Sequence, residues 1–592
     1  MISQYFPRHL HWILLFTLIL LLTLAIPTLM QAKLPTPQLL TDPFLQFPTP
    51  NSVRVVWFTE FPGTLHQVRY GKNLDHTVTA ITRQLTRTRE DQDSRVGEQT
   101  TPGTLYSHPT WRPIWRHEAE VTGLVPGQRV PYQVISQDSN HQPVSSRVFS
   151  LAGTPTPGTP LKILLTSDHQ LKPMTAANLQ KVSETVGQVD AVFFAGDLVN
   201  IPDRASEWFD DHRGNAFFPV LQGHGSASLT HDGVTTVYTG GEIIQHAPLF
   251  PTIGNHEIMG EFSMEIPLNQ QFSRTRPQWA ATQLYDQLPM PTATETNRET
   301  WIKNHAFNTD TYQEIFSLPE PQTYYATTFG DIRLISLYLT NVWRSPRTEG
   351  QRRGRYQEAP EDFSHPENWG YGQHLLAAIT PGTPQYQWLV AELQSPEFQR
   401  ARYKIVMFHH PAHTLGLNVI PPYTDPVQTI ERDATGQIQQ IRYSYPKEKD
   451  YIIQEVVPLL EAAGVQLVIY GHSHLWNRFV SPQGVHFLET SNVGNTHGAY
   501  LGDKPRRFPD FDQNSVAVGD PNGLTPAIPT LARVPGDSDG TQPYIASNEV
   551  TVFSIFETAT GTLSSYYFDT RHPNSAVVKF DQIRVRQEAI DN

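Results

Sequence analysis

The feature that most constrains this chain is a series of five short apolar runs, each followed at once by polar residues of the kind that bind metal ions. The clearest run, at 465–469, leads through Tyr470 and Gly471 into His472 and His474. Side chains at positions i and i+2 point to the same side of an extended backbone, so both imidazoles can face one site. The other four runs lie at 163–166, 191–195, 249–253 and 405–408.

Each run is typical of a buried strand, and stretches such as 174–189 that can be helical separate the runs. Buried strands that alternate with helices indicate a layered α/β domain. Polar side chains at the ends of such strands predict a metal site at the edge of the sheet. The residues delivered there are Asp168, Gln170, Asp197, Asn255, His256, His409, His472 and His474.

Composition limits what such a site can use. The chain has 592 residues, enough for two or more cores, and it contains no cysteine. A metal site must therefore use His, Asp, Asn, Gln or water, which excludes thiolate zinc sites and iron–sulfur clusters. The formal net charge of -13, with no basic stripe, argues against nucleic acid as a partner.

The N-terminal residues 1–33 have the pattern of an export signal. Arg8 and His9 precede an almost wholly apolar run at 12–30, which is long enough to match the roughly 18 residues that can span a bilayer. A cleaved signal peptide and a retained membrane anchor are the two readings, and the terminal position argues against a buried core helix. We expect export to the periplasm or the extracellular space, with membrane contact at least during export.

Residues 37–152 predict an all-β sandwich. The segments 53–58, 67–71, 117–121 and 130–134 alternate apolar and polar residues, and turn signals separate them. Residues 123–127 followed by Tyr132 are similar to the E–F corner of a fibronectin type III-like module. Nothing in this region suggests chemistry, so we expect a structural or docking role.

A Pro-, Thr- and Gly-rich stretch at 154–160 marks the boundary to the α/β domain, which we expect over 160–500. Two long insertions, including the Gly- and His-rich segment 223–241 and an aromatic hairpin at 324–337, are expected at the ligand-bearing edge, where specificity usually lies. Residues 501–592 supply a loop and strands. We expect the strands at 484–488 and 550–556 to complete the second sheet of that domain.

The order and spacing of these polar residues resemble the calcineurin-like metallophosphoesterase superfamily. The motifs that carry the resemblance are Gly-Asn-His-Glu at 254–257 and Gly-His-Ser-His at 471–474, with Arg478 completing the Gly-His-x-His-x-x-x-Arg form. The β-sandwich in front narrows the resemblance to purple acid phosphatase-like proteins. The fold implied is a two-sheet α/β sandwich behind a fibronectin type III-like domain.

The resemblance implies two divalent metal ions and assigns their ligands. One metal takes Asp168, His474 and a third ligand at Gln170, whereas the second takes Asn255, His409 and His472. Asp197 bridges the two, as a carboxylate can when two cations lie about 3.5–4 Å apart. His256 is implied as the residue that stabilises the transition state or protonates the leaving oxygen, and Arg478 and Asn255 as further substrate contacts.

Two positions depart from the family pattern. The histidine of the first motif is His169, with Gln170 at the ligand position, and glutamine can bind a hard cation through its carbonyl oxygen. Asn200 stands where purple enzymes carry a tyrosinate ligand, which argues against a purple Fe(III) centre and leaves Mn²⁺, Zn²⁺ or Fe²⁺. His409 rather than His410 matches the family's ligand, and His410 is then a packing or supporting residue.

The remaining candidates have plainer explanations. His224, His231 and His246 could line a substrate pocket but are more typical of solvated loops. The aromatic residues Tyr324, Tyr325, Trp343 and Trp369 are more typical of core or hairpin packing than of a base-stacking platform.

The function that fits best is an exported phosphatase that hydrolyses phosphomonoesters through a hydroxide held between two metals. One alternative is a phosphodiesterase or nucleotide pyrophosphatase on the same scaffold. The other is a non-catalytic envelope binding protein with a structural metal site, against which His256 counts, because a structural site would not require it. A small phosphorylated substrate is the expected partner in the two enzymatic readings.

Overall fold

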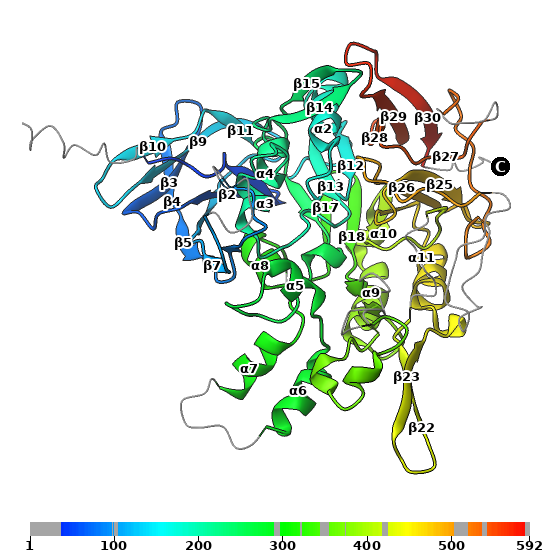
Figure 1. Cartoon of the computed structure of the whole chain (residues 1–592). Helices are drawn as coiled ribbons and strands as arrows, with labels where there is room; N and C mark the ends of the chain where they lie inside the picture. The colour runs from blue at the N-terminus through cyan, green and yellow to red at the C-terminus, as the bar shows by residue number, and fades with distance from the viewer. Residues whose placement is uncertain are drawn as a thin grey trace, which may run out of the picture.

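The computed structural model of the chain describes residues 37–96, 99, 105–288, 297–319, 323–343, 354–372, 374–416, 424–501, 519–534 and 541–585. The predicted export signal at 1–33 lies outside these ranges. Within them, no helix is both long enough and apolar enough to cross a membrane. Figure 1 shows a β domain at the N-terminus beside a larger mixed domain.

The predicted β-sandwich is present as two antiparallel sheets that pack around one core. That core includes Trp57, Val68 and Tyr132, all fully buried. Alternation in the sequence specifies these strands because every second side chain points into the space between the sheets. One sheet has the order β1(Phe44–Thr49), β2(Ser52–Thr59), β8(Trp115–Thr122), β5(Ile81–Gln84), and the other β10(Pro143–Ser145), β9(Val130–Gln137), β3(Leu65–Tyr70), β4(His76–Thr79), with β11(Phe149–Leu151) on β9. Two further strands of two residues each, β6(Arg89–Glu90) and β7(Thr110–Trp111), pair with each other and belong to neither sheet.

Two mixed sheets form the second domain. The first has the order β16(Leu249–Pro251), β13(Ala191–Phe194), β12(Lys162–Thr166), β28(Val550–Glu557), β29(Thr562–Asp569), β30(Val578–Arg584). The second has the order β17(Tyr325–Phe329), β18(Ile332–Ser336), β21(Tyr403–Met407), β24(Leu467–Tyr470), β26(His486–Thr490), β25(Trp476–Val480), β27(Tyr544–Ile545). All five predicted apolar runs are strands, and those within one sheet are parallel. Their carboxyl ends therefore lie at one edge.

Helices cover the outer faces of this pair of sheets. The predicted helix near 174–189 is α2(Thr175–Val186), and it packs on the first sheet through Ala176, Leu179 and Val182. The second sheet is covered by α9(Pro384–Leu393), α10(Pro396–Arg400) and α11(Val457–Ala462). Four short helices, α3(Ala205–Phe209), α4(Phe217–Leu221), α5(Leu268–Ser273) and α8(Asp310–Ile315), come from the segments that join the strands. Two more, α6(Gln278–Asp286) and α7(Arg298–His305), lie below the sheets in Figure 1.

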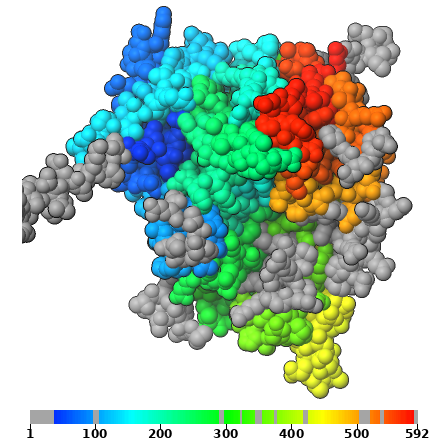
Figure 2. All heavy atoms as spheres, turned by 45° about the horizontal axis from the view of Figure 1, so that its top comes forward, coloured from blue at the N-terminus to red at the C-terminus, as the bar shows by residue number. Residues whose placement is uncertain are grey.

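The sandwich is joined to the second domain through aromatic packing. Phe44 and Phe58 contact Phe218 with ring centroids 5.0 and 5.4 Å apart, and all three belong to the larger domain's core. The Tyr132 hydroxyl, expected in a fibronectin-type corner, instead donates to the carbonyl of Gln245 across the boundary. Figure 2 shows the blue and cyan sandwich pressed against the green part of the chain, with the red terminal strands on its other side.

Two expectations about the sheets need correction. The strand near 484–488 (β26) does belong to the second sheet, but β28 pairs antiparallel with β12, so the closing strands are divided between both sheets. The aromatic hairpin at 324–337 forms as β17–β18 but is an integral edge of the second sheet and not an insertion. The projecting insertion is another hairpin, β22(Val427–Arg432) and β23(Ile438–Ser444), which extends away from the domain in Figure 1.

Candidate metal centre

The polar residues predicted from the five strand ends meet in one buried cluster. Asp168, Asp197 and His409 place one potential ligand atom each within 4.8 Å of one another, and so do His409, His410 and His472. These side chains are almost fully shielded from solvent. The two groups share His409, so they form one continuous cluster.

The backbone at this edge is held in an uncommon conformation. Five of the predicted ligands have positive φ, a left-handed geometry that costs about 1–3 kcal/mol for a residue other than glycine. They are Asp168 (56°), Gln170 (37°), Asp197 (58°), His472 (81°) and His474 (55°). Strain concentrated in this way is typical of a site whose geometry matters more than local stability.

Two glycines allow the carboxylates to come this close. A β-carbon on Gly254 would lie 2.2 Å from Oδ1 of Asp197, and one on Gly471 would lie 2.1 Å from Oδ2 of Asp168. Any side chain at either position would displace a carboxylate. This explains why glycine stands immediately before Asn255 and before His472.

Asp197 lies at the centre of the cluster. Its Oδ2 is 3.2 Å from Nε2 of His409 and accepts a hydrogen bond of 3.0 Å from the side-chain amide of Gln170. Its Oδ1 accepts the backbone N–H of His256 at 2.8 Å. A carboxylate with both oxygens turned toward different neighbours is suited to bridge two cations.

The side chain of Asn255 lies between His409 and His472. Its Oδ1 lies 3.2 Å from Nε2 of His409 and 3.0 Å from Nδ1 of His472. The backbone N–H of His472 donates to both carboxylate oxygens of Asp168, at 3.1 and 2.9 Å. Residues from both sheets are thereby fixed around one small volume.

Backbone carbonyls orient two of the imidazoles. Nδ1 of His409 bonds to the carbonyl of Ala195 and Nδ1 of His474 to that of Asn495, both at 2.8 Å. Because a carbonyl only accepts, these Nδ1 atoms carry the proton, and Nε2 of each ring is the atom turned toward a carboxylate or cation. Nε2 of His474 is 3.6 Å from Asp168 Oδ1.

The side chain of Gln170 shows whether the cluster suits a cation. Its amide nitrogen is used on Asp197, whereas its Oε1 is buried and accepts no hydrogen bond from any described residue. An amide oxygen left without a donor in a closed site costs about 1–3 kcal/mol. A hard divalent cation accepts such an oxygen, so the donor set of this site fits a metal.

The charges of the cluster are also unbalanced without a cation. Burial raises the pKa of Asp168 to about 7, an effect that the charge of Asp197 increases and His409 partly offsets. Burial alone would lower the pKa of His409, but Asp197 and Asp168 outweigh it and raise that pKa to about 10. Burial and the neighbouring histidines keep the pKa of His472 well below its ordinary value. A divalent cation would relieve the repulsion between the carboxylates.

His256 lies at the side of the cluster. Its Nδ1 donates to the carbonyl of Asn200 at 2.8 Å, and its ring stacks on Phe272 with centroids 5.2 Å apart. Asn200 itself faces elsewhere, because its side-chain amide donates to the carbonyl of Gln170. The position that would hold a tyrosinate in a purple centre thus supplies a backbone carbonyl to His256.

Two carboxylates that our sequence analysis gave no role hold the strand ends in place. Glu257 accepts the backbone N–H groups of Asp197, Leu198 and Gly254 at 2.7–2.8 Å. Glu489 accepts the N–H of Ser473 at 2.8 Å. Burial raises the pKa of each to about 8. Glu257 was visible in the Gly-Asn-His-Glu motif, but no signal marks Glu489.

Arg478 does not face the site. It lies on β25, where its guanidinium forms a buried ion pair with Asp581 of β30, with a closest N–O distance of 2.9 Å. The expected substrate contact is therefore wrong for this residue. Its role is to tie the edge of the second sheet to the last strand of the first.

The insert histidines bind other parts of the chain and do not line the centre. His224 contacts Asp42 at 2.7 Å, His246 contacts Glu242 and Ser150 at 2.9 and 3.0 Å, and His231 contacts Thr570 at 3.2 Å. His224 and His246 thus fasten this domain to the sandwich. The hairpin between them is β14(Ala227–His231) and β15(Val234–Tyr238).

His410 and the aromatic residues pack as predicted. His410 Nδ1 bonds to Thr340 Oγ1 at 2.5 Å, and its ring stacks on His472 with centroids 3.8 Å apart. Trp343, on β19(Thr340–Trp343), contacts the His472 ring at 4.8 Å. Tyr325 donates to the carbonyl of Pro251, Tyr324 packs on Trp388, and Trp369 packs on Tyr371.

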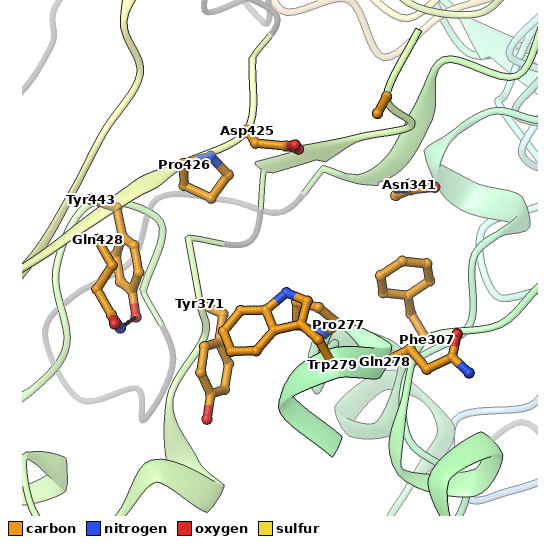
Figure 3. A pocket seen from close by; sticks show the side chains of 11 residues that line it. Pro277, Gln278, Trp279, Phe307, Asn341, Tyr371, Asp425, Pro426, Gln428 and Tyr443 are labelled. Atoms are coloured by element: carbon orange, nitrogen blue, oxygen red, sulfur yellow. Dashed lines mark hydrogen bonds between the residues drawn. The ribbon is translucent and has the colours of Figure 1, made fainter. Parts of the chain in front are cut away.

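An open pocket of about 500 Å³ lies beyond β19. Figure 3 shows Trp279 at its centre, next to Tyr371, with Asn341 and Phe307 on one side and Asp425, Pro426 and Gln428 on the other. Asn341 follows Thr340, the residue bonded to His410. One residue of the pocket is therefore the sequence neighbour of a residue that supports the metal centre.

Comparison with known proteins agrees with this geometry. A family model described as the purple acid phosphatase N-terminal domain matches residues 41–152, and one described as calcineurin-like phosphoesterase matches 161–475. No curated protein matches the chain.

Several solved structures are similar at low sequence identity. Purple acid phosphatase PPD1 from yellow lupin (Lupinus luteus) seeds is 14% identical, with a TM-score of 0.48, over 92% of this chain and 74% of that one. PhoD is 13% identical, with a TM-score of 0.43, over 94% of each chain. GAP50 of Plasmodium, titled the anchor in the inner membrane complex, is 9% identical, with a TM-score of 0.31, over 71% of this chain and 89% of that one.

The phosphoesterase match spans more than half of the 592 residues and contains every predicted ligand from Asp168 to His474. The geometry supports the same conclusion, because carboxylates, an amide oxygen and imidazoles converge in one buried cluster that fits metal ions. The chain belongs to the calcineurin-like phosphoesterase family and is a metal-dependent phosphoester hydrolase that carries a purple acid phosphatase-like N-terminal domain.

Proposed function

We propose that this protein hydrolyses phosphomonoesters outside the cytoplasm, with the predicted export signal at 1–33 directing it there. The observation that carries the proposal is the buried meeting of Asp168, Asp197, Asn255 and His409 around the unsatisfied Oε1 of Gln170. Such a donor set suits two hard or borderline cations, and phosphoryl transfer needs little else than positioning and charge stabilisation.

The contacts are compatible with the ligand assignment that the family resemblance implies. Asp168, Gln170 and His474 would hold one cation, Asn255, His409 and His472 the other, and Asp197 both. Two cations in this position lower the pKa of a bound water and stabilise both the attacking and the leaving oxygen. Mn²⁺, Zn²⁺ and Fe²⁺ all suit the set. A ferric purple centre does not, because Asn200 supplies no phenolate.

His256 is the proposed proton donor to the leaving oxygen. Its Nδ1 proton is donated to the carbonyl of Asn200, so proton exchange with the substrate would take place at Nε2. A side chain in this role typically contributes about 10²–10⁴-fold to the rate. Its backbone N–H donates to Asp197, which fixes the imidazole beside the centre.

The experiment is metal analysis of the protein, followed by hydrolysis of an aryl phosphomonoester and an aryl phosphodiester before and after chelation. We expect two cations per chain, faster cleavage of the monoester, and full loss with chelator. Preferential cleavage of the diester would replace phosphatase by phosphodiesterase as the function. No bound metal and no cleavage after reconstitution with Mn²⁺, Zn²⁺ or Fe²⁺ would overturn both.

A His256→Ala variant completes this test, with His231→Ala as its control. His231 belongs to the same domain but bonds to Thr570, outside the centre. We expect His256→Ala to keep its metals and lose about 10²–10⁴-fold in kcat, while the control stays active. Equal activity of the two variants would rule out proton donation by His256.

A further inference from the structure

Asp91 belongs to the N-terminal domain that contains the β-sandwich, yet its carboxylate binds two elements of the catalytic domain. It follows β6 and is fully buried. Oδ1 accepts a hydrogen bond from Nη2 of Arg204 at 3.0 Å, and Oδ2 accepts the backbone N–H of Leu268 at 2.6 Å. Arg204 immediately precedes α3, and Leu268 is the first residue of α5. Hydrogen bonds connect Arg204 to His256, and α5 packs on the His256 ring.

The first connection runs through a line of hydrogen bonds. Arg204 donates from Nη1 to Oε1 of Glu207 at 2.9 Å. The other oxygen of Glu207 accepts the backbone N–H groups of Asn200 and Ile201 at 2.7 and 2.9 Å. The carbonyl of Asn200 then accepts the Nδ1 proton of His256. This sequence of contacts fixes the acceptor that orients the imidazole.

The second connection runs through α5. Leu268 is its first residue, and Phe272, four residues on, stacks on the His256 ring at an interplanar angle of 29°. Residues i and i+4 of a helix lie on one face, so anchoring Leu268 also sets the position of Phe272. Asp91 thus fixes both what the ring nitrogen bonds to and what the ring face packs on.

We propose that Asp91 is a positioning residue for His256, so that the β-sandwich takes part in the chemical step of the neighbouring domain. This inference rests on the proposed function. An imidazole displaced by about 1 Å can lose 10²-fold in rate, although it remains folded in place. The sandwich is then more than the structural or docking module that its sequence indicates.

The test is the dependence of Asp91→Asn and Asp91→Ala on the leaving group. A nitrophenolate leaves without a proton, whereas an alkoxide needs one. We expect kcat for an alkyl phosphate to fall by about 10–100-fold, as for other residues that orient a functional group, with KM unchanged. For dinitrophenyl phosphate we expect a change of less than about threefold, because proton donation contributes little there.

Two controls separate positioning from folding. Glu118→Gln makes the same chemical change as Asp91→Asn at another domain contact, where Glu118 binds Arg116 and Ser317 and touches neither Arg204 nor α5. We expect it to leave the leaving-group dependence unchanged. In a His256→Ala background, Asp91→Ala should cause no further loss, because the residue it positions is gone.

Equal losses with both substrates, or losses that multiply with His256→Ala, would overturn the positioning role. Failure of the proposed function looks different. In that case the unaltered protein cleaves neither ester, or His256→Ala is itself indifferent to the leaving group.

A second inference concerns the pocket around Trp279. This residue lines the pocket and is 54% exposed to solvent. Its indole meets Tyr371 edge-on, with centroids 5.3 Å apart, and Phe307 and Pro277 add further apolar surface. Amide groups come from Asn341, Gln278 and Gln428. Aromatic faces with a few amides suit a flat ring that carries hydrogen-bonding atoms.

Two further features of the pocket are its few charged residues and its connection to the residues that support the metal centre. Among the described residues that line the pocket, Asp425 is the only ionisable acid or base other than tyrosine, so this lining does not suit a phosphate. Phe307 precedes Asn308, whose backbone pairs with Met259, three residues after His256. Asn341 likewise follows Thr340, so two residues of the pocket adjoin, along the chain, residues that support the reacting groups.

We infer that the pocket binds the ring of the leaving group in aryl or nucleoside phosphomonoesters, an inference that also rests on the proposed function. The probes are adenosine 5′-monophosphate and glycerol phosphate. For Trp279→Ala we expect KM for the nucleotide to rise about tenfold, as for loss of one stacked base, and KM for glycerol phosphate to stay constant. Trp279→Phe should restore most of the difference. Equal effects on both substrates would overturn the inference, whereas cleavage of neither by the unaltered protein would instead count against the proposed function.

Discussion

Two groups of stacked, buried histidines occur in this molecule, one in each domain. In the sandwich, His66 and His117 stack with centroids 3.6 Å apart, and at the metal centre His410 and His472 stack at 3.8 Å. All four are shielded from solvent. Ring geometry and burial are therefore nearly the same, and only one pair belongs to a metal site.

The difference lies in the atoms around the rings. Nε2 of His117 faces the hydroxyl of Thr59 at 2.8 Å and Nδ1 that of Thr82 at 2.9 Å. A hydroxyl donates or accepts, so it satisfies a neutral ring. At the metal centre, His409 joins His472 to the carboxylate of Asp197. Burial makes a histidine neutral, and a nearby carboxylate makes the group a cation site.

The strongest way to break this comparison is Asp197→Ala. Without its carboxylate the centre becomes a histidine cluster like that of the sandwich. We expect kcat/KM to fall by at least about 10³-fold, more than for loss of a single hydrogen-bond donor, because both cations lose a ligand. Elemental analysis should show fewer than two cations per chain. Retention of both with normal activity would contradict the assignment of Asp197.

Removal of the metals should destabilise the catalytic domain but not the sandwich. Cations that bind only the folded state at 100 times their Kd stabilise it by about 2.7 kcal/mol. We expect a chelator to lower the melting temperature of the catalytic domain and to increase hydrogen exchange at β12 and β24, while β2 and β8 keep their protection. Equal loosening of both domains would contradict a site confined to one of them.

Acid should destabilise the fold through the sandwich pair, because protonation of a buried neutral histidine opposes folding. Burial, with the charge of His66 and Arg116, lowers the pKa of His117 to about 2. The unfolded chain, with a histidine pKa near 6.5, then binds the proton that the folded chain excludes, so stability falls as pH drops below about 6.5. Between pH 7 and 5 this amounts to about 2 kcal/mol.

Hydrogen exchange of β8 amides at pH 7 and pH 5, corrected for intrinsic rates, measures this loss. His117→Gln should flatten the dependence. Protection of β8 that is equal at both pH values in the unaltered protein would show that His117 is protonated in the fold.

The smallest expected effect is that of Thr82→Val. This change removes one of the two hydroxyl partners of His117 at a half-buried position, which we expect to cost about 1 kcal/mol of unfolding free energy. Activity should not change, because the pair lies outside the metal centre. A loss of activity without a loss of stability would show that the sandwich histidines also influence catalysis.

The centre could be predicted from sequence because its signal is local. Each predicted ligand, such as Asp197 or His409, lies within a few residues of the end of an apolar run, and parallel strands bring such ends together. The sandwich was predictable for a similar reason, since alternation fixes which face is buried. The predicted ends of an element can agree with the structure to within a few residues. Helix α2, for example, was predicted near 174–189 and spans Thr175–Val186.

Contacts between distant segments gave no such signal. Arg478 fits a local motif, but its partner Asp581 lies 103 residues later, and the strand direction turns the guanidinium toward it. Glu489 supports the loop of Ser473 from another strand. The pairing of β28 with β12 depends on which strand fits beside the first one in three dimensions, and single-sequence patterns do not encode that choice.

That pairing bears on the order in which the protein can be made. The register matches Ile163 with Phe556, so the strand that carries Asp168 waits for a neighbour synthesised almost 400 residues later. A ribosome adds about 5–20 residues per second, so β12 spends some 20–80 seconds with an open edge while the sandwich is already able to fold. Until the last sheet strands emerge, the nascent chain presents an open edge of β12, which can pair with other chains unless it is covered.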